Sequence, residues 1–590
     1  MPNTRFEIAP CPPDAVARLV GELGVSGALA QVLVRRGLAE PRQARAFLAA
    51  DEEYSPDCFT AIGDATTVIL AHVQAGSKIT IHGDYDVDGV CSTAVLLRVL
   101  RELGANVDSY LPDRADGYGL SEDTVSRLAA RGTRLLISVD CAITAVEQVA
   151  LARELGMEVV VTDHHAPRGD GVLPQAPIVH PALCGYPCPE LCATAVAYKL
   201  AQALLNGAGE HGVHSEGRRA LEEDLDLVAL ATIADAVPLL GENRTLVRRG
   251  LRALAGTGKP GLRALMAVAG VEADRVNERS VAFALAPRLN AAGRLYRADA
   301  ALELILSEDP ARAAQIAQEL DSANHERRRV EGRVRIEAEA QVAELGERSA
   351  YVLAGEGWHA GVVGIVASRL AERHGRPFVL IALEGERGKG SGRSVEGFDL
   401  LAALSACASH LLRHGGHRAA AGLEIERGRV AQFAAALDDH ATAILAGEEL
   451  VAVERVDAVV GGEEVGMTLA EELQALAPFG RGNPSVALML ADASFSDARP
   501  MGEGRHVRFT VQSGGARARA VAFGMGARLP VEDGVAAQAT FSLEVNEWNG
   551  VSEPRLVLRQ AQAALAPAED RDPAHEPAAP VEELVLFALP

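Results

Sequence analysis

The chain has 590 residues, 48% of them hydrophobic and 23% charged, so we expect several globular domains rather than a fibrous or disordered chain. A formal net charge of −23 excludes a protein coated in nucleic acid, although a local basic channel is compatible with it. Eight cysteines in so long a chain exclude a disulfide framework. Neither a membrane span nor a signal peptide is predicted, so we expect a cytoplasmic protein without a membrane partner.

Residues 1–65 are expected to form a helical segment without evident chemistry. The first chemical pattern is the stretch 82–89, in which His82, Asp86 and Asp88 follow a predicted strand and precede a predicted helix. Crowded carboxylates repel one another, and a divalent cation would relieve that repulsion. A solvated loop with a helix N-cap is the simpler alternative, whereas a calcium loop would need a final Glu that is missing.

Strands and helices alternate across the region 66–255, which predicts a parallel sheet. Polar residues close three further segments: Asp140 follows the strand at 135–139, Asp163-His164-His165 follows the strand at 158–162, and Asp235 follows an apolar run. Ligands bind outside the carboxyl ends of parallel strands, so these side chains can converge. Asp and His suit Mn²⁺ or Mg²⁺ better than structural zinc. Each carboxylate alone has a structural explanation, but all four segments together predict a metal site.

These four segments resemble the motifs of the DHH phosphoesterase family. The resemblance implies two divalent cations, Mn²⁺ or Mg²⁺, with His82 and Asp86 at one and Asp88, His164 and Asp235 at the other. It also implies that Asp140 bridges them, that Asp163 orients the histidines and that His165 touches the substrate phosphate. Two such cations can generate a hydroxide and neutralise a phosphate ester. The residues alone do not choose whether His165 binds a phosphoryl oxygen or protonates the leaving group.

The region 256–345 contains the motif 286–294 and a long charged stretch that predicts a solvated helix. This motif resembles the one that follows the DHH domain in RecJ exonucleases, in which a connector helix joins two domains. The resemblance implies substrate contacts by five side chains: Arg114, Tyr118, Arg288, Asn290 and Arg294.

A second α/β unit is predicted over residues 346–450. Its glycine-rich stretches 390–394 and 414–418 have the composition of ordinary turns, but they can also bring backbone N–H groups to phosphates. They resemble the DHH-associated domain, which implies that Ser391, Arg393 and His417 bind substrate.

Short alternating strands over residues 451–565 predict a small β-barrel. The stretches 478–484 and 546–550 resemble the oligonucleotide-binding barrel of the same family. His506, Arg508 and Trp548 are candidates for contacts with bases or phosphates. Residues 566–590 are expected to form a linker and a tail that either adds a strand or docks a partner.

The predicted architecture is therefore α/β and multidomain: a parallel-sheet DHH domain, a long connector helix, an α/β DHH-associated domain and an OB-like barrel. The resemblance implies 5′→3′ hydrolysis of single-stranded DNA, with release of 5′-mononucleotides, in DNA repair and recombination. Expected partners are single-stranded DNA with a 5′ end, a single-strand-binding protein and a repair helicase. The alternatives are a phosphodiesterase acting on oligoribonucleotides or cyclic dinucleotides, and a non-catalytic replication scaffold.

Three departures from the family pattern concern turns rather than ligands. Ala142 replaces a usual Gly, His180 replaces a usual Asn, and Ala193-Thr194-Ala195 replaces a glycine-rich turn. We expect these changes to affect turnover more than metal binding.

Overall fold

The computed structural model describes residues 4–112, 119–209, 218–295, 297, 299–445, 452–526, 528–548 and 551–564. They form two compact units. The first contains residues 4, 5 and 476–485 and the described residues of 42–453, and the second contains residues 6–41, 454–475 and the described residues from 486 onward. In the first unit, α3 (Pro41–Ala49) and α4 (Ile62–Gln74) precede the sheet.

The centre of the first unit is a five-stranded sheet in which every pairing is parallel, as predicted. Its strands are β2 (Ile79–His82), β3 (Val107–Tyr110), β4 (Leu135–Val139), β5 (Glu158–Thr162) and β6 (Ile178–Val179). The order β3-β2-β4-β5-β6 reverses direction between β2 and β4. In open α/β sheets such a switch point opens a crevice at the carboxyl ends of the two strands.

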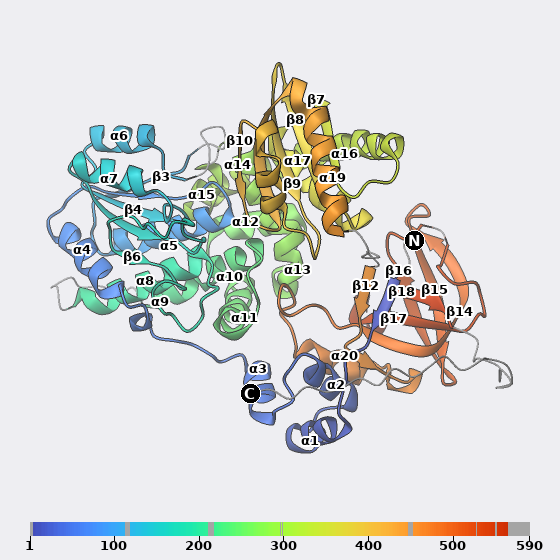
Figure 1. The fold of residues 1–590 in the computed structure, drawn as a ribbon. Helices are drawn as coiled ribbons and strands as arrows, with labels where there is room; N and C mark the ends of the chain where they lie inside the picture. The colour runs from blue at the N-terminus through green and yellow to red at the C-terminus, as the bar shows by residue number, and fades with distance from the viewer. Residues whose placement is uncertain are drawn as a thin grey trace, which may run out of the picture. The chain divides into compact units, whose positions relative to one another are not determined.

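Helices cover both faces of this sheet (Figure 1). One layer contains α4, α5 (Val87–Glu102) and α8 (Ala193–Ala208), and the other contains α6 (Glu122–Ala130) and α7 (Val146–Glu154). Along β4, Leu135 and Ile137 join the core of the first layer, whereas Leu136 joins that of the second. Because successive strand residues face opposite ways, an almost wholly apolar strand indicates a sheet buried on both sides.

A helical region follows the sheet and ends in the long connector. Its helices are α9 (Arg218–Glu223), α10 (Leu225–Ala234), α11 (Gly241–Ala255), α12 (Pro260–Ala269), α13 (Glu278–Ser280), α14 (Ala286–Leu295) and α15 (Asp299–Leu306). The connector, α16 (Pro310–Leu345), has 36 residues. Asp309 caps it by accepting a hydrogen bond from the N–H of Ala311, and Pro310 occupies the first turn. The predicted long helix is confirmed.

The predicted second α/β unit contains a mixed sheet of order β10-β11-β9-β8-β7. Its strands are β7 (Tyr351–Glu356), β8 (Phe378–Glu384), β9 (Arg387–Arg393), β10 (Arg413–Gly416) and β11 (Ala420–Glu426). Its helices are α17 (Ala360–His374), α18 (Leu400–Ala406) and α19 (Val430–Leu445). Residues 390–393 therefore form the second half of β9, paired with β8 and β11, so the expectation of a turn at this point is wrong.

The second unit contains the predicted barrel (Figure 1). Its strands are β13 (Ala458–Val459), β14 (Leu488–Met501), β15 (His506–Ser513), β16 (Ala516–Ala522), β17 (Ala537–Trp548) and β18 (Val551–Ala563). Pairing of β14 with β17 closes the barrel.

The second unit also contains α1 (Pro13–Leu23), α2 (Gly27–Arg35) and α20 (Met467–Gln474). The helix α2 contacts β13, α20 contacts β17 and β18, and α1 packs on α2. The short strand β1 (Thr4–Glu7) pairs with β12 (Ala452–Arg455). The Gln31 side chain donates to the carbonyl of Val459 and accepts from its N–H. The sequence pattern did not predict this long-range contact.

Candidate active site

The predicted metal ligands converge at the carboxyl end of the parallel sheet. His82 ends β2, Asp140 follows β4, His164 follows β5 and Asp235 caps the end of α10. Donor atoms of Asp88, His164 and Asp235 lie within 4.8 Å of one another, and the family resemblance assigned these three residues to one cation.

A second group of donors contains a residue that the sequence analysis did not include among the ligands. Asp84, Asp86 and Asp140 offer oxygens that lie within 4.8 Å of one another, and Asp84 is only 3% exposed. Gly89 lets the chain pack closely here, because a Cβ at Gly89 would lie 2.4 Å from the carbonyl oxygen of Asp84. The alternation of carboxylates at positions 84, 86 and 88 is the sequence pattern that could have predicted Asp84 as a ligand.

The backbone orients two of these carboxylates. Oδ1 of Asp86 accepts hydrogen bonds from the N–H groups of Asp88 (2.9 Å) and Gly89 (3.1 Å), so the N-cap alternative also applies to Asp86. The carboxylate of Asp88 accepts from the N–H groups of Ala193 (2.7 Å) and Thr194 (2.8 Å) and from the Thr194 hydroxyl (2.6 Å). The departure at 193–195 therefore keeps the amide donors at the start of α8.

The electrostatics of the cluster favour a bound cation. Burial, followed by the neighbouring carboxylates, raises the pKa of Asp140 well above its usual range and that of Asp235 to about 8. Burial lowers the pKa of His82 to about 4 and also lowers that of His164, so both imidazoles are neutral. Nε2 of each ring is buried without a hydrogen-bond partner. Neutral imidazoles beside crowded carboxylates are the donor set that Mn²⁺ or Mg²⁺ requires, so the residues fit the predicted cations.

His165 is held by a neighbouring carboxylate. Its Nδ1 lies 2.8 Å from Oδ1 of Asp163, which also accepts from the N–H groups of His164 (2.7 Å) and His165 (3.1 Å). Burial lowers the pKa of His165, but the hydrogen bond to Asp163 and the charges of nearby carboxylates outweigh it and raise the pKa to about 9. The structure therefore places Asp163 behind His165, where it orients the ring.

The two single-residue departures lie next to these groups. Nε2 of His180 donates to the carbonyl of His165 at 2.8 Å, while its Nδ1 accepts from the N–H of Leu183 at 3.3 Å. Ala142 has a φ of +81°, a left-handed conformation that a glycine would adopt without steric cost. His180 therefore supports the site, whereas Ala142 adds local strain.

The motif 286–294 forms α14 and contacts the acidic loop. Oδ1 of Asn290 accepts from the N–H of Val87 at 3.1 Å, and a Cβ at Gly293 would lie 2.8 Å from the carbonyl oxygen of Tyr85. Nη1 of Arg294 donates to the carbonyl of Gly361 at 2.6 Å, linking α14 to α17.

Arg288 forms an ion pair within the protein. Its Nε lies 2.8 Å from Oδ1 of Asp321 on α16, its Nη1 donates to the carbonyl of Ala284 at 2.7 Å, and the residue is 7% exposed. Nε and Nη1 of Arg288 therefore have partners within the protein, and a substrate contact by Arg288 stays a prediction.

A pocket of about 610 Å³ adjoins the metal ligands within the first unit. One wall contains Ile233 and Ala234, which directly precede Asp235, and Asn290 also lines it. Five arginines also line it, Arg294, Arg327, Arg328, Arg335 and Arg369, together with one carboxylate, Glu331, that pairs with Arg327 and Arg369. Such a surplus of arginine suits the phosphates of a strand that leads to the ligands.

The predicted contacts of the second α/β unit lie in different settings. Ser391 and Arg393 are partly buried neighbours on β9, joined by a 2.9 Å hydrogen bond. A Cβ at Gly364 of α17 would lie 2.8 Å from the Ser391 hydroxyl, so this pair packs directly against α17. His417 is exposed beside the β10–β11 turn. Arg114 and Tyr118 lie outside the described residues.

The stretch 478–484, which was expected to belong to the barrel, packs in the first unit instead. The N–H of Leu239 donates to the carbonyl of Arg481 at 2.8 Å, four residues beyond Asp235. The side chain of Arg481 is exposed, and its charge acts to lower the pKa of Asp235. A basic residue from late in the chain therefore lies close to an early metal ligand.

On the barrel, the exposed aromatic side chain that stands out is Phe523 at 42% exposure. The ring of His506 lies 5.3 Å from its ring and the guanidinium of Arg555 lies 5.9 Å from its centroid. The sequence pattern predicts a contact by His506 but not by Phe523, which follows β16. Arg508 is exposed on β15, and the side chain of Trp548 lies outside the described residues.

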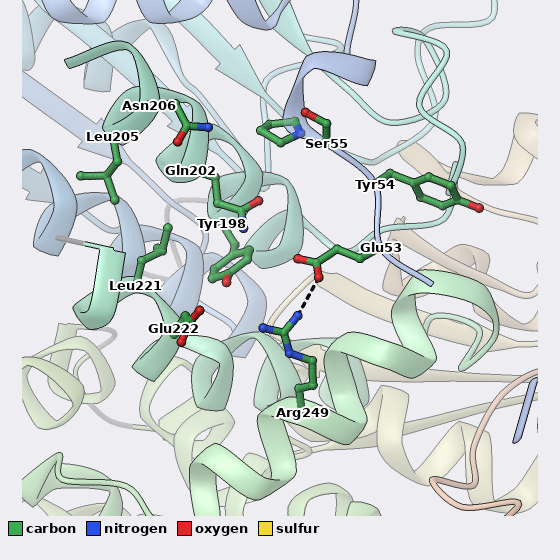
Figure 2. A pocket seen from close by; sticks show the side chains of 11 residues that line it. Glu53, Tyr54, Ser55, Tyr198, Gln202, Leu205, Asn206, Leu221, Glu222 and Arg249 are labelled. Carbon is green, nitrogen blue, oxygen red and sulfur yellow. Dashed lines mark hydrogen bonds and ion pairs between the residues drawn. The ribbon is translucent and has the colours of Figure 1, made fainter. Parts of the chain in front are cut away.

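A second pocket, of about 520 Å³, lies in the first unit and is lined by Tyr198 and Gln202 of α8, among others. Figure 2 shows the Glu53–Arg249 ion pair beside Tyr198. None of the predicted ligands lines this pocket.

Among the described residues no single helix meets the length and hydropathy of a membrane span, although the bent pair α1 and α2 does so jointly.

Family models match three parts of the chain. The N-terminal domain of the DHH family matches residues 78–232, the DHHA1 domain matches residues 346–443, and the RecJ OB domain matches residues 456–560.

Whole-chain relatives agree with these matches. Single-stranded-DNA-specific exonuclease RecJ of Bacillus subtilis is 38% identical over 94% of this chain and 70% of its own length. The Escherichia coli protein of the same name is 36% identical, covering 84% and 89%. The crystal structure of RecJ with Mn²⁺ from Thermus thermophilus superposes with a TM-score of 0.82 at 30% identity, covering 96% of this chain and 80% of that one.

Proposed function

Because the chain belongs to the RecJ family of single-stranded-DNA-specific exonucleases, we propose that it hydrolyses single-stranded DNA from the 5′ end and releases 5′-mononucleotides. The observation that carries this proposal is the pair of donor groups around Asp140, one containing Asp84 and Asp86 and the other containing His164. Two neighbouring donor groups that share a carboxylate suit a pair of Mn²⁺ or Mg²⁺ ions.

We propose that His82, Asp84 and Asp86 hold one cation, that Asp88, His164 and Asp235 hold the other, and that Asp140 bridges them. When bound, such cations supply a hydroxide nucleophile at neutral pH and neutralise charge on the phosphate. The chain fixes the ligands in advance, since amides of α5 and α8 already orient Asp86 and Asp88.

In this proposal one atom of His165, Nε2, binds the substrate phosphate and donates a proton to the leaving oxygen. Its Nδ1 is hydrogen-bonded to Asp163, so Nε2 is the nitrogen that can reach a phosphoryl or leaving oxygen. With a pKa of about 9, the imidazolium carries that proton at neutral pH and can donate it to the departing 3′-oxygen.

The basic pocket supplies the binding site for the strand. Its arginines lie between α14, α16 and α17, and its wall at Ala234 adjoins the ligand Asp235. Ser391, Arg393 and His417 remain proposed phosphate contacts. Family membership supports a cytoplasmic role in DNA repair and recombination, with a single-strand-binding protein and a helicase as proposed partners.

The test uses purified protein with Mn²⁺ or Mg²⁺ and 5′-phosphorylated single strands labelled at either end. We expect mononucleotides from the 5′ end, sparing of duplex DNA, and loss of hydrolysis but not of DNA binding in Asp140→Ala. The matched control is Asp438→Ala, which replaces an Asp bonded to the N–H groups of Ser349 and Ala350. Release from the 3′ end, or hydrolysis of cyclic dinucleotides or oligoribonucleotides alone, would contradict the proposal.

A further inference from the structure

Phe283 is 70% exposed, which is unusual for a large aromatic residue. It lies in a π-helical turn, Val281–Leu285, directly before α14. Its neighbours Val281 and Leu285 are 0% and 1% exposed, so the turn is anchored on both sides while Phe283 points outward. Single π-helical turns are frequently found at functional sites.

The surroundings of Phe283 indicate what its ring can contact. Phe283 lines the basic pocket together with Arg327 and Arg328, and Nη2 of Arg328 lies 3.5 Å from the Phe283 carbonyl oxygen. A flat apolar ring among guanidinium groups matches a polymer that alternates phosphates with aromatic bases. Proteins that bind single strands without sequence preference combine these two elements, because every base presents a π-face.

We propose that Phe283 is a stacking platform for one unpaired base of the strand whose phosphates lie against the pocket arginines. This inference rests on the proposed function and adds a residue that discriminates among substrates. In a duplex both faces of an internal base are covered by its neighbours and its edge is paired, so stacking on Phe283 requires an unpaired, unstacked base. Phe283 would thus favour single strands without reading their sequence.

The experiment measures binding of oligodeoxynucleotides that carry one abasic site at successive positions from the 5′ end. Fluorescence anisotropy in Ca²⁺ is used so that binding is recorded independently of hydrolysis. We expect one position at which loss of the base weakens binding by the wild-type protein about 5- to 150-fold, the range for stacking of one base on an aromatic side chain.

Two variants and a control complete the test. Phe283→Ala should bind the intact strand more weakly by the same factor and lose the sensitivity to the abasic position, whereas Phe283→Tyr should retain both. Ile336→Ala is the control, since Ile336 is 65% exposed on α16 but does not line the pocket. Thermal unfolding of Phe283→Ala should match the wild type, because an exposed ring contributes little to the core.

The outcomes separate this inference from the proposed function. An unchanged abasic profile in Phe283→Ala, or an equal loss of affinity in Ile336→Ala, would overturn the stacking platform even if DNA is degraded. A Phe283-dependent abasic profile in a protein that releases no mononucleotides with Mn²⁺ would overturn the proposed exonuclease and leave the platform standing.

Discussion

Oδ1 of Asp163 lies 2.8 Å from Nδ1 of His165, and its other oxygen accepts from the N–H of Ile143 at 2.9 Å. The carboxylate thus holds the imidazole through one oxygen and the turn after β4 through the other. We expect Asp163→Asn to reduce the rate of DNA hydrolysis about 10- to 100-fold, because an amide NH₂ must face one of these N–H donors.

The pH–rate profile gives the more specific readout for Asp163→Asn. Asp163 raises the pKa of His165 to about 9, so its loss should move the alkaline limb to lower pH. The control is Asp170→Asn, which removes an exposed carboxylate that also follows β5. An unshifted alkaline limb with a lower rate would show that Asp163 acts only on folding.

Metal binding should release protons at neutral pH. The pKa of Asp235 is about 8 in the metal-free protein, above its usual value, so the folded state holds a proton that a cation must displace. Calorimetric titration with Mn²⁺ at pH 7 in buffers of different ionisation enthalpy should show proton release, and the share from Asp235 should decline as pH rises through 8. Asp235→Asn should release fewer protons on binding Mn²⁺. A wild-type protein that releases no protons on binding Mn²⁺ would contradict the prediction.

The same shifts set the sign of the pH dependence of stability. A carboxyl whose folded pKa lies above its unfolded value destabilises the fold as pH rises between the two values. The stabilisation from His165, whose folded pKa is about 9, is likewise present below pH 6.5 and lost as pH rises through 9. Below pH 6.5 the lowered pKa values of His82 and His164 oppose this trend. The unfolding temperature of the metal-free protein should therefore fall from pH 6.5 to 9, and Mn²⁺ should reverse the fall.

Arg328 and Arg329 form a matched pair on α16. Both are exposed, but Arg328 lines the basic pocket while Arg329 pairs with Glu326 outside it. Arg328→Gln should weaken single-strand binding and reduce the slope of log K against log salt by about 0.7, the value for one phosphate contact. Arg329→Gln should change neither, and equal effects would place the strand elsewhere.

Removal of the Arg288 guanidinium should affect stability. Arg288→Leu leaves the buried carboxylate of Asp321 without its main cation and should cost about 3 kcal/mol of the free energy of unfolding. The double variant Arg288→Leu/Asp321→Leu should recover much of that loss in denaturant unfolding. A stable single variant with reduced DNA affinity would support the prediction of a substrate contact.

The hydrogen bond of His180 predicts that glutamine, but not alanine, can replace this histidine. His180→Ala removes the donor to the His165 carbonyl and should lower the rate about tenfold. His180→Gln can place its amide nitrogen near the position of Nε2 and should retain most activity. If Gln and Ala were equally impaired, the contribution of His180 would be packing rather than this hydrogen bond.

The sequence determined much of this protein on its own. Strands that end in Asp140 and Asp163 specified a parallel sheet and the edge at which ligands meet, because the carboxyl ends of parallel strands share one edge. The charged run after Asp309 specified a long helix, and alternating strands after residue 486 specified a barrel. These features are local in sequence, so periodicity and turn composition are enough to predict them.

Tertiary structure decided the features that depend on distant contacts. Whether Arg288 pairs with Asp321 depends on how α14 packs against α16, and the same packing exposes Phe283. The stretch around Arg481 lies beside Leu239, more than 240 residues earlier in the chain, through a backbone hydrogen bond. No periodic pattern encodes such pairings, because the free energy that selects them comes from burial and hydrogen bonding across separate segments.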